Sequence, residues 1–268
     1  MTAQSPLPPV LRRENHGAIA HLRLTRASAR NTLSLAAMAA MLDALESIAA
    51  DPAIRVVLLS GEGPAFCAGH DLKELSLHRS DADGGRAFFA GTFAQCSALM
   101  LAVASLPQPV VAVVEGVATA AGCQLVASCD LAVAGAEATF CTPGVNIGLF
   151  CSTPMVPLTR AVAPKHAMEM LLTGEPIGAQ EALRFGLVNR VAPAGSALAA
   201  AMALAEKIAS KSRHTLAIGK RAFQAQAHLP LAQAYEAAGK VMVENLLDAC
   251  ARAGVAAFLE KRAPEWPA

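Results

Sequence analysis

Two short stretches of sequence decide the fold of this chain: AFCAGHDL at Ala65–Leu72 and EGVATAAGCQL at Glu115–Leu125. Each follows an apolar run typical of a buried strand, Val56–Leu59 before the first and Val110–Val114 before the second. Each then leads into the start of a helix. Where a strand gives way to a helix, unpaired main-chain N–H groups and the positive end of the helix dipole converge. Both stretches therefore predict main-chain donors for a polarised oxygen.

The segments around the first stretch alternate between strand and helix patterns. Gly17–Leu24 is a strand-like apolar run. Asn31–Ser34 opens a helix in which apolar residues recur every three or four positions, with Ser34 placed to cap the free N–H groups. The strand Val56–Leu59 comes next. Because strand, helix, strand is the pattern of a βαβ unit, an α/β fold is predicted.

The rest of the chain is increasingly helical. His78–Gly85 is polar and glycine-bearing and is predicted to be a mobile loop. Helices are expected at Arg86–Ser105 and Ala120–Ser128, and a buried strand at Leu131–Ala134. With no Ser/Gly linker, we predict an α/β core over residues 1–195 and a helical C-terminal region over 196–268. The amphipathic runs of this region are Ala197–Ser210, Leu216–Ala227, Leu231–Leu247 and Cys250–Lys261.

The composition excludes several classes of protein. Hydrophobic residues make up 54% and charged residues 16% of the 268 residues, which predicts a large core or an extensive subunit interface. Proline, glycine or charge interrupts each apolar run before about 20 residues, so no membrane segment is expected. The net charge of +1 gives no electrostatic footprint for nucleic acid.

The cysteine pattern and the N-terminus predict a reducing location. The seven cysteines are scattered through apolar segments, so neither a disulfide framework nor a metal site is expected. The first nine residues lack the basic and apolar parts of an export signal. Reduced thiols in the cytoplasm are the simplest expectation.

The two stretches together resemble the crotonase superfamily, also called the enoyl-CoA hydratase/isomerase family. The resemblance extends from about Val10 to Trp266 and implies a crotonase-like spiral of ββα units with a helical C-terminal extension. In that family the two segments hold a thioester oxygen of an acyl-CoA and stabilise an enolate. By this resemblance, the donors are the main-chain N–H groups of His70 and Ala121. The family more often has a run of glycines at the second segment, so Ala120 and Ala121 narrow the space for the thioester.

The resemblance breaks at the two usual catalytic glutamates. Gln124 stands at the first position, and Gly144, in the Phe140–Gly144 segment, stands at the second. A glutamine does not exchange a proton at neutral pH, and glycine has no side chain. Gln124 could bind water, the thioester or a carboxylate substituent, or it could be a satisfied buried amide. Gly144 could give room for a bulkier acyl chain or mark a backbone kink.

Other side chains offer proton transfer only weakly. Cys123, Cys141, Cys151 and Ser152 fall near the predicted pocket, where a thiol with a lowered pKa would be a base or nucleophile, but a lone cysteine is more often a small core residue. The His70 imidazole lies beside a donor and has a suitable ordinary pKa.

The resemblance also implies where coenzyme A binds. It places the adenine near the main chain of Ala68 and a nucleotide contact at Arg30. Lys261 matches a lysine that reaches the nucleotide of a neighbouring subunit. A homotrimer or hexamer is therefore implied, with residues 196–268 as the trimerisation region. No cofactor is expected apart from the CoA thioester, which is the substrate.

Three functions remain open at this point. The first is a lyase or isomerase on CoA thioesters, of the enoyl-CoA hydratase type in fatty acid metabolism, with weak conventional hydratase activity because both glutamates are missing. The second is a non-catalytic acyl-CoA-binding or partner subunit. The third is a decarboxylase or thioesterase on the same scaffold.

Overall fold

The computed structural model describes residues 9–267, and a twisted six-stranded sheet forms the base of the fold. Strands β2, β3, β5, β7 and β10 run parallel to their neighbours, and β1 pairs antiparallel with β2 at one edge. The order is β1 (Leu11–His16), β2 (Ile19–Leu24), β3 (Val56–Gly61), β5 (Val110–Val114), β7 (Leu131–Gly135) and β10 (Arg190–Ala192).

Three strands of a second, four-stranded sheet each follow one of the central strands, and β9 adds the fourth after α6. After β3, β5 and β7 the chain crosses to this sheet, so consecutive strands alternate between the two sheets before a helix returns the chain. This repetition is a spiral of ββα units. The second sheet has the order β4 (Ala65–Cys67), β6 (Val117–Thr119), β8 (Thr139–Cys141) and β9 (Ile177–Gly178).

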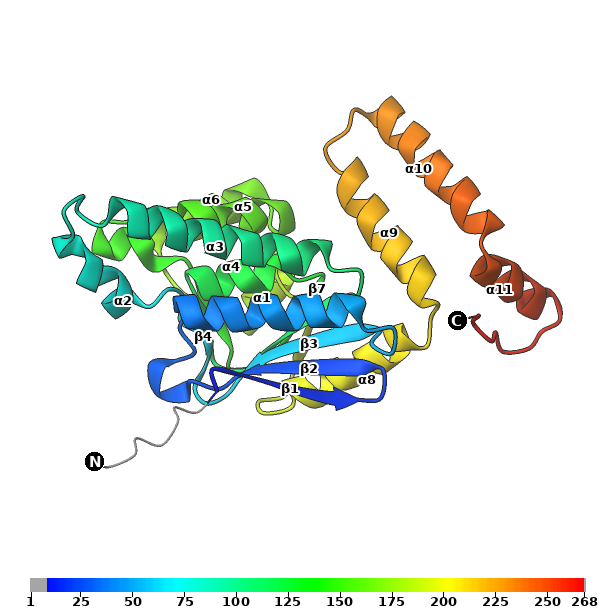
Figure 1. Ribbon diagram of the computed structural model, residues 1–268, viewed down its shortest axis with the longest axis horizontal. Coiled ribbons are helices and arrows are strands. Elements are labelled where there is room, and N and C mark those ends of the chain that lie inside the picture. Colours follow the sequence, from blue (N-terminus) through cyan, green and yellow to red (C-terminus); the bar gives the residue numbers. More distant parts are fainter. Residues whose placement is uncertain (1–8, 268) are drawn as a thin grey trace.

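Helices cover both faces of the large sheet and extend into a C-terminal arm (Figure 1). Helices α1 and α3 lie along one face, and α8 lies on the other. The helices are α1 (Leu35–Ala50), α2 (Leu72–Leu77), α3 (Arg86–Ser105), α4 (Ala121–Ser128), α5 (Ser152–Ala161), α6 (Pro164–Thr173), α7 (Ala179–Phe185), α8 (Ala197–Ala209), α9 (Arg213–Gln226), α10 (Leu231–Leu247) and α11 (Ala249–Leu259), with 3₁₀ turns at Ala27–Ala29, His78–Ser80 and Pro143–Ile147.

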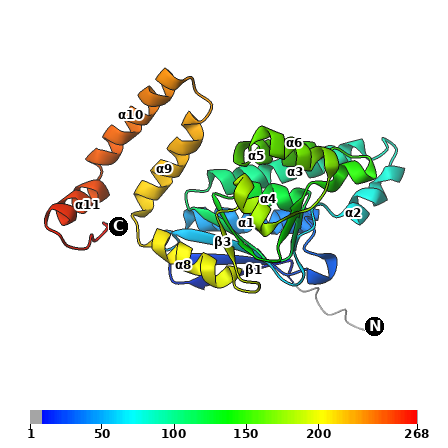
Figure 2. The same ribbon diagram turned by 180° about the vertical axis from the view of Figure 1, so that it is seen from behind.

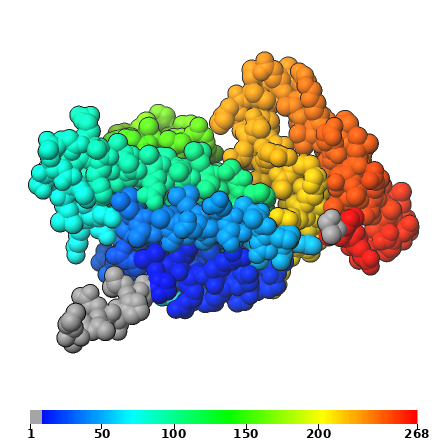
Figure 3. All heavy atoms as spheres, viewed as in Figure 1, coloured from blue at the N-terminus to red at the C-terminus, as the bar shows by residue number. Residues whose placement is uncertain are grey.

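The region after residue 196 is not uniform in its packing. The alanines of α8, Ala197, Ala201 and Ala205, are buried against the large sheet. In contrast, α9 and α10 bury no residue of their own completely. Figures 2 and 3 show α9, α10 and α11 projecting from the body as an arm. The packing thus places α8 with the core, and the arm begins at α9.

Helix α3 is apolar enough to cross a membrane by length and composition alone. It has 20 residues, and its most apolar window has a mean hydropathy of 1.7. The expectation that no apolar run reaches this length was therefore wrong, because Gly91 does not interrupt the helix. In the fold α3 packs against α1 and α4, and 28% of that apolar window is buried.

Most of the expected elements are present. The βαβ unit formed by β2, α1 and β3 is confirmed, and the Ser34 Oγ accepts a hydrogen bond from Ala37 N–H at 3.2 Å, as a helix cap does. The helix at Arg86–Ser105 has the predicted bounds. Within His78–Gly85 the chain forms a 3₁₀ turn, and the Asp83 carboxylate accepts hydrogen bonds from the N–H groups of Gly85 and Ala87. The edge strand β1 was not expected.

Candidate active site

The first predicted donor lies in the turn between β4 and α2. Gly69 has φ +84°, a conformation that glycine adopts without steric cost, and its carbonyl accepts a hydrogen bond from Leu33 N–H at 2.8 Å. His70 follows, and the Asp71 carboxylate caps α2 by accepting from the N–H groups of Lys73 and Glu74 at 3.1 and 3.3 Å. The turn is thus fixed on both sides of His70.

The second predicted donor lies in the turn between β6 and α4. Ala120 has φ +52° and ψ −118°, and its N–H donates to the Cys141 carbonyl at 2.9 Å. Ala121 is the first residue of α4, so its N–H has no acceptor within the helix. The Ala120 carbonyl accepts from Gln124 N–H at 3.0 Å, which closes the first helical turn.

The two turns lie side by side. Strands β4 and β6 pair in parallel, and a Cβ placed on Gly69 would lie 3.2 Å from Ala121 N and 3.0 Å from Ala120 Cβ. A Cβ placed on Gly122 would overlap the carbonyl oxygen of Cys67. Only glycine therefore lets α4 approach β4 this closely. The structure thus brings the turns that carry His70 and Ala121 together.

Both donors are available for a ligand. Among residues 9–267, neither His70 N–H nor Ala121 N–H has a hydrogen-bond acceptor. Two main-chain donors on adjacent turns are the arrangement that stabilises an oxyanion. One such donor contributes about 3–4 kcal/mol in acyl-transfer enzymes.

Gln124 is buried on α4, one turn beyond these donors. Its side chain is 3% exposed, and its Oε1 accepts only a long contact of 3.9 Å from the Cys96 thiol. Burial raises the pKa of Cys96 to about 11, so this thiol is a protonated but weak donor. The side chain of Gln124 is therefore only weakly hydrogen-bonded, and its amide group can form a hydrogen bond with a further partner.

Gly144 does not open a space for an acyl chain. A Cβ at this position would lie 2.6 Å from the Leu149 carbonyl oxygen and 2.9 Å from Cys151 Sγ. The interpretation of Gly144 as extra room is corrected by this packing, because the side chain that is absent would collide with backbone. The tight 3₁₀ turn at Pro143–Ile147 is the alternative that the structure supports.

The thiols near the turns are unsuited to act as bases or nucleophiles. Burial raises the pKa of Cys123, Cys141 and Cys151 above the ordinary value of a thiol. Cys141 Sγ also contacts Thr119 Oγ1 at 3.1 Å. Because their pKa values are raised, these three thiols remain protonated at neutral pH. The reactive species is the thiolate, so they are poor bases and nucleophiles.

The His70 ring is neutral and unpartnered. Burial lowers its pKa, and neither ring nitrogen has a hydrogen-bond partner among the described residues. The ring stands edge-on to Phe93 of α3, with the centroids 5.3 Å apart. This apolar neighbour was not identified from the sequence, because nothing in the α3 pattern separates Phe93 from Phe88 or Phe89.

The candidate CoA-binding residues fall into two groups. Ala68 N–H donates to the Arg30 carbonyl at 3.0 Å, so these two lie together beside the first turn. The Arg30 side chain is exposed. Lys261 follows α11, at the opposite end of the molecule from α2 (Figure 1). Within one chain, Lys261 therefore does not lie beside Arg30 and Ala68.

A separate groove lies beside the C-terminal arm. A groove of about 1120 Å³ runs between α9 of the arm and helices α3, α4 and α5 of the core. Gln124 lies on its wall, whereas His70 and Ala121 do not line it. The Lys220 ammonium donates to the Asp130 carboxylate at 2.6 Å at this junction, which ties α9 to the core.

Comparison with known proteins agrees with this geometry. The family model described as enoyl-CoA hydratase/isomerase matches residues 14–268. The chain belongs to this family. The fold prediction is confirmed, since the chain superposes on a Mycobacterium smegmatis enoyl-CoA hydratase with a TM-score of 0.91, at 46% identity over 97% of this chain and 99% of that one.

Relatives from animals and bacteria are also similar. The mouse protein named enoyl-CoA hydratase domain-containing protein 3, mitochondrial, is 48% identical over 92% of this chain and 81% of its own length. The structure of human enoyl coenzyme A hydratase domain-containing protein 3 has a TM-score of 0.91, with 45% identity over 96% of this chain and 100% of that one. A putative enoyl-CoA hydratase of Thermus thermophilus is 36% identical over 93% of this chain and 98% of its own length.

One prediction is overturned by these relatives. The mouse, rat and human proteins are named mitochondrial, which contradicts the expected cytoplasmic location. The cytoplasmic location was inferred from cysteines that the sequence predicts to be unpaired. Free thiols do not distinguish the cytoplasm from other reducing compartments, so the cysteines alone do not predict a cytoplasmic location.

Proposed function

We propose that this protein binds an acyl-CoA thioester and stabilises its enolate through the main-chain N–H groups of His70 and Ala121. The observation that carries the proposal is the pairing of these two unclaimed donors on adjacent strand-to-helix turns. Developing negative charge on the thioester oxygen gains more from such donors than the neutral carbonyl does. The reaction class would be that of a lyase or isomerase.

Conventional hydration is proposed to be weak. General acid and base groups each contribute about 10²–10⁴-fold, and the two positions that carry them in the resembled family are Gln124 and Gly144. The His70 imidazole lies beside the donors, its lowered pKa keeps it neutral, and its ring nitrogens have no hydrogen-bond partner among the described residues. It is our candidate for moving the α proton of the substrate.

Recognition of the coenzyme and assembly follow from the same proposal. Arg30 and Ala68 would bind the nucleotide, and Lys261 would reach the nucleotide of an adjacent subunit in a homotrimer or hexamer. Support for assembly comes from the arm, which exposes large apolar side chains. Phe223, Leu231, Tyr235 and Phe258 are 72%, 75%, 74% and 81% exposed.

The central test separates enolate formation from hydration. Purified protein is incubated with butyryl-CoA in D₂O, and deuterium at the α carbon is measured by mass spectrometry, while hydration of crotonyl-CoA is followed by absorbance. We expect α-exchange with little hydration. Loss of exchange in His70→Gln, which keeps the main-chain N–H, would assign the base to the ring. Hydration at the rate of an ordinary hydratase would refute the proposal.

Restoring one carboxylate gives a second test. Gln124→Glu should raise crotonyl-CoA hydration by about 10-fold or more, because it returns one acid or base group. Gln124→Met is the matched control, since it preserves length without a titratable group and should give no gain. Gly144→Glu is a poor partner for this test, because its Cβ would collide with Leu149 and Cys151.

The absent carboxylates also favour a second candidate, a non-catalytic acyl-CoA binder or partner subunit. Calorimetric binding of butyryl-CoA without any α-exchange would support it. A decarboxylase or thioesterase on the same scaffold would appear as product when a panel of CoA thioesters is screened by mass spectrometry. A thiol-dependent thioesterase gains no support, because burial raises the pKa of Cys123, Cys141 and Cys151.

A further inference from the structure

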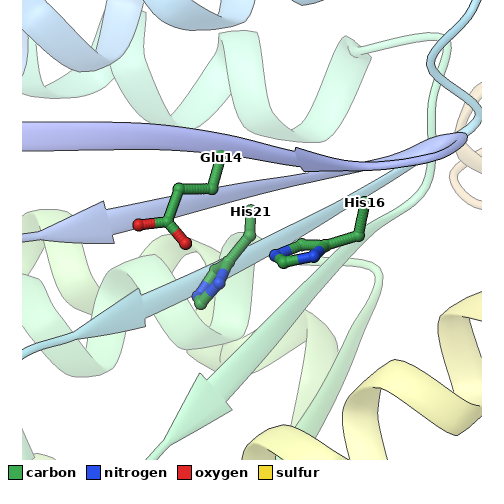
Figure 4. Close-up of side chains that lie close together, drawn as sticks. All are labelled: Glu14, His16 and His21. Carbon is green, nitrogen blue, oxygen red and sulfur yellow. The ribbon is translucent and has the colours of Figure 1, made fainter.

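Three metal-ligating side chains converge on the hairpin formed by β1 and β2. Glu14 and His16 are two residues apart on β1, so they share one face of the strand, and Glu14 is the register partner of His21 on β2. Figure 4 shows the carboxylate and the two imidazoles gathered in one space beside the hairpin. One ligand atom from each of the three lies within 4.8 Å of the others.

The cluster combines a buried ligand that is held in place with a ligand that is exposed to solvent. His21 is 2% exposed, on the face of the sheet that α8 covers, and its Nε2 forms a 2.7 Å hydrogen bond with Ser60 Oγ on the neighbouring strand β3. His16 is exposed and Glu14 is partly buried. The ring centroids of His16 and His21 are 6.3 Å apart. A buried anchor and an exposed partner provide both a fixed position and an entry path from solvent.

We propose that Glu14, His16 and His21 bind one Zn²⁺ ion, or a similar divalent transition metal, with solvent in the fourth position. Two imidazoles and one carboxylate are a ligand set that suits Zn²⁺, whereas Mg²⁺ and Ca²⁺ prefer oxygen ligands. Bonds of about 2.0–2.2 Å in a tetrahedron place ligand atoms about 3.3 Å apart. The exposed His16 side chain has the freedom to make this closure.

Ser60 fits the outer shell of such a site. A metal-bound histidine usually donates its other ring N–H to a hydrogen-bond acceptor, which fixes the ring and its tautomer. With Nε2–H donated to Ser60 Oγ, the lone pair for the metal lies on Nδ1 of His21.

The charges around Glu14 are compatible with a metal. Arg12 and Arg23 approach its carboxylate at 3.9 and 3.7 Å, which is longer than a hydrogen-bonded ion pair. Both arginines also approach Glu62, at 3.9 and 3.7 Å. Glu62 therefore keeps the guanidinium groups partnered when Glu14 turns to the metal.

The location suggests a structural role. The cluster lies near the turn that joins β1 to β2, at the end of the hairpin away from α2 and the oxyanion turns (Figure 1). Strand β1 is the edge of the large sheet and pairs only with β2 in the described chain. A metal held by both strands would fasten this edge without taking part in the chemistry at His70 and Ala121.

The test is zinc titration of the full-length protein. After removal of metals with EDTA and dialysis, ZnCl₂ is titrated into the protein by calorimetry. We expect one site per chain, a dissociation constant raised at least 10-fold in His16→Ala and in Glu14→Gln, and an unchanged constant in His228→Ala, which removes another exposed histidine. Zinc should raise the melting temperature of the wild type but not of His16→Ala. Circular dichroism checks that each variant is folded.

Cobalt distinguishes this site from the cysteines. Co²⁺ bound by imidazole and carboxylate gives weak visible bands without the strong near-ultraviolet absorption of thiolate ligation, and the proposal requires that first pattern. Ser60→Ala should weaken zinc binding about 10-fold, as loss of an outer-shell partner does. The proposal is overturned by absence of saturable binding, by equal affinity in wild type and His16→Ala, or by a thiolate spectrum with cobalt.

Discussion

The turn after β4 and the turn after β6 carry out the same structural task with different residues. Each places one residue at positive φ just before a helix, Gly69 at +84° in the first and Ala120 at +52° in the second. Glycine accepts this conformation freely, whereas an alanine there costs about 1–3 kcal/mol. Hydrogen bonds from Ala120 N–H to Cys141 and from Gln124 N–H to Ala120 hold the strained residue in place. The second turn therefore stores strain beside the donor of Ala121, as functional sites often do.

The largest expected effect comes from separating the two turns. In Gly122→Ala the new Cβ would overlap the Cys67 carbonyl, so α4 must move away from β4. We expect a loss of about 3 kcal/mol in the free energy of unfolding, the upper end for overpacking, together with loss of α-exchange. Urea denaturation and the exchange assay measure the two effects.

The matched control is another helical glycine with open space around it. A Cβ on Gly91 of α3 has no atom within 4 Å. Gly91→Ala should therefore raise stability by about 0.5–1 kcal/mol through helix propensity. If Gly122→Ala proved as stable as Gly91→Ala, the close approach of α4 to β4 would be wrong.

Exchanging the residues at positive φ tests the comparison directly. Ala120→Gly should raise the free energy of unfolding by about 1 kcal/mol, because relief of roughly 1–3 kcal/mol of strain exceeds the entropic cost of glycine. The reverse change, Gly69→Ala, should lower it by about 2 kcal/mol, since its Cβ meets Ala120 Cβ at 3.0 Å and Thr119 O at 3.1 Å.

Ala90→Gly is the control for this exchange. Ala90 is an exposed helical residue, so glycine there should cost about 1 kcal/mol. The opposite signs at positions 90 and 120 are the signature of strain at Ala120. A cost at both positions would mean that the second turn is relaxed.

The sequence predicts the large elements because their patterns are long. Ser34 and the apolar period after it define α1, and apolar runs define β3, β5 and β7. Strand β1 was missed because Leu11–His16 is almost entirely polar, which is typical of an exposed edge. Strands β4, β6 and β8 have three residues each, too few to show a period.

The positions of the two turns were predictable from the sequence, but their contacts were not. The resemblance located His70 and Ala121 on the two turns, because both lie in contiguous motifs. The strain at Ala120 depends on a bond to Cys141, and the filled space at Gly144 depends on Leu149 and Cys151. These contacts arise from tertiary packing, which the local sequence pattern does not contain.

The smallest expected effect sharpens the comparison through pH, because only the first turn carries a titratable ring. Burial holds the folded-state pKa of His70 below the ordinary 6.5, so between these two pKa values the unfolded chain binds more protons than the folded one. The stability linked to His70 is present above about pH 6.5 and is lost as the pH falls through this window.

The free energy of unfolding should therefore decline less steeply between pH 7.5 and 5 in His70→Gln than in the wild type, as urea titrations at each pH would measure. The lowered pKa of His21 has the same sign but is common to both proteins and cancels in the difference. Equal slopes in His70→Gln and the wild type would show that the ring is not held neutral by burial.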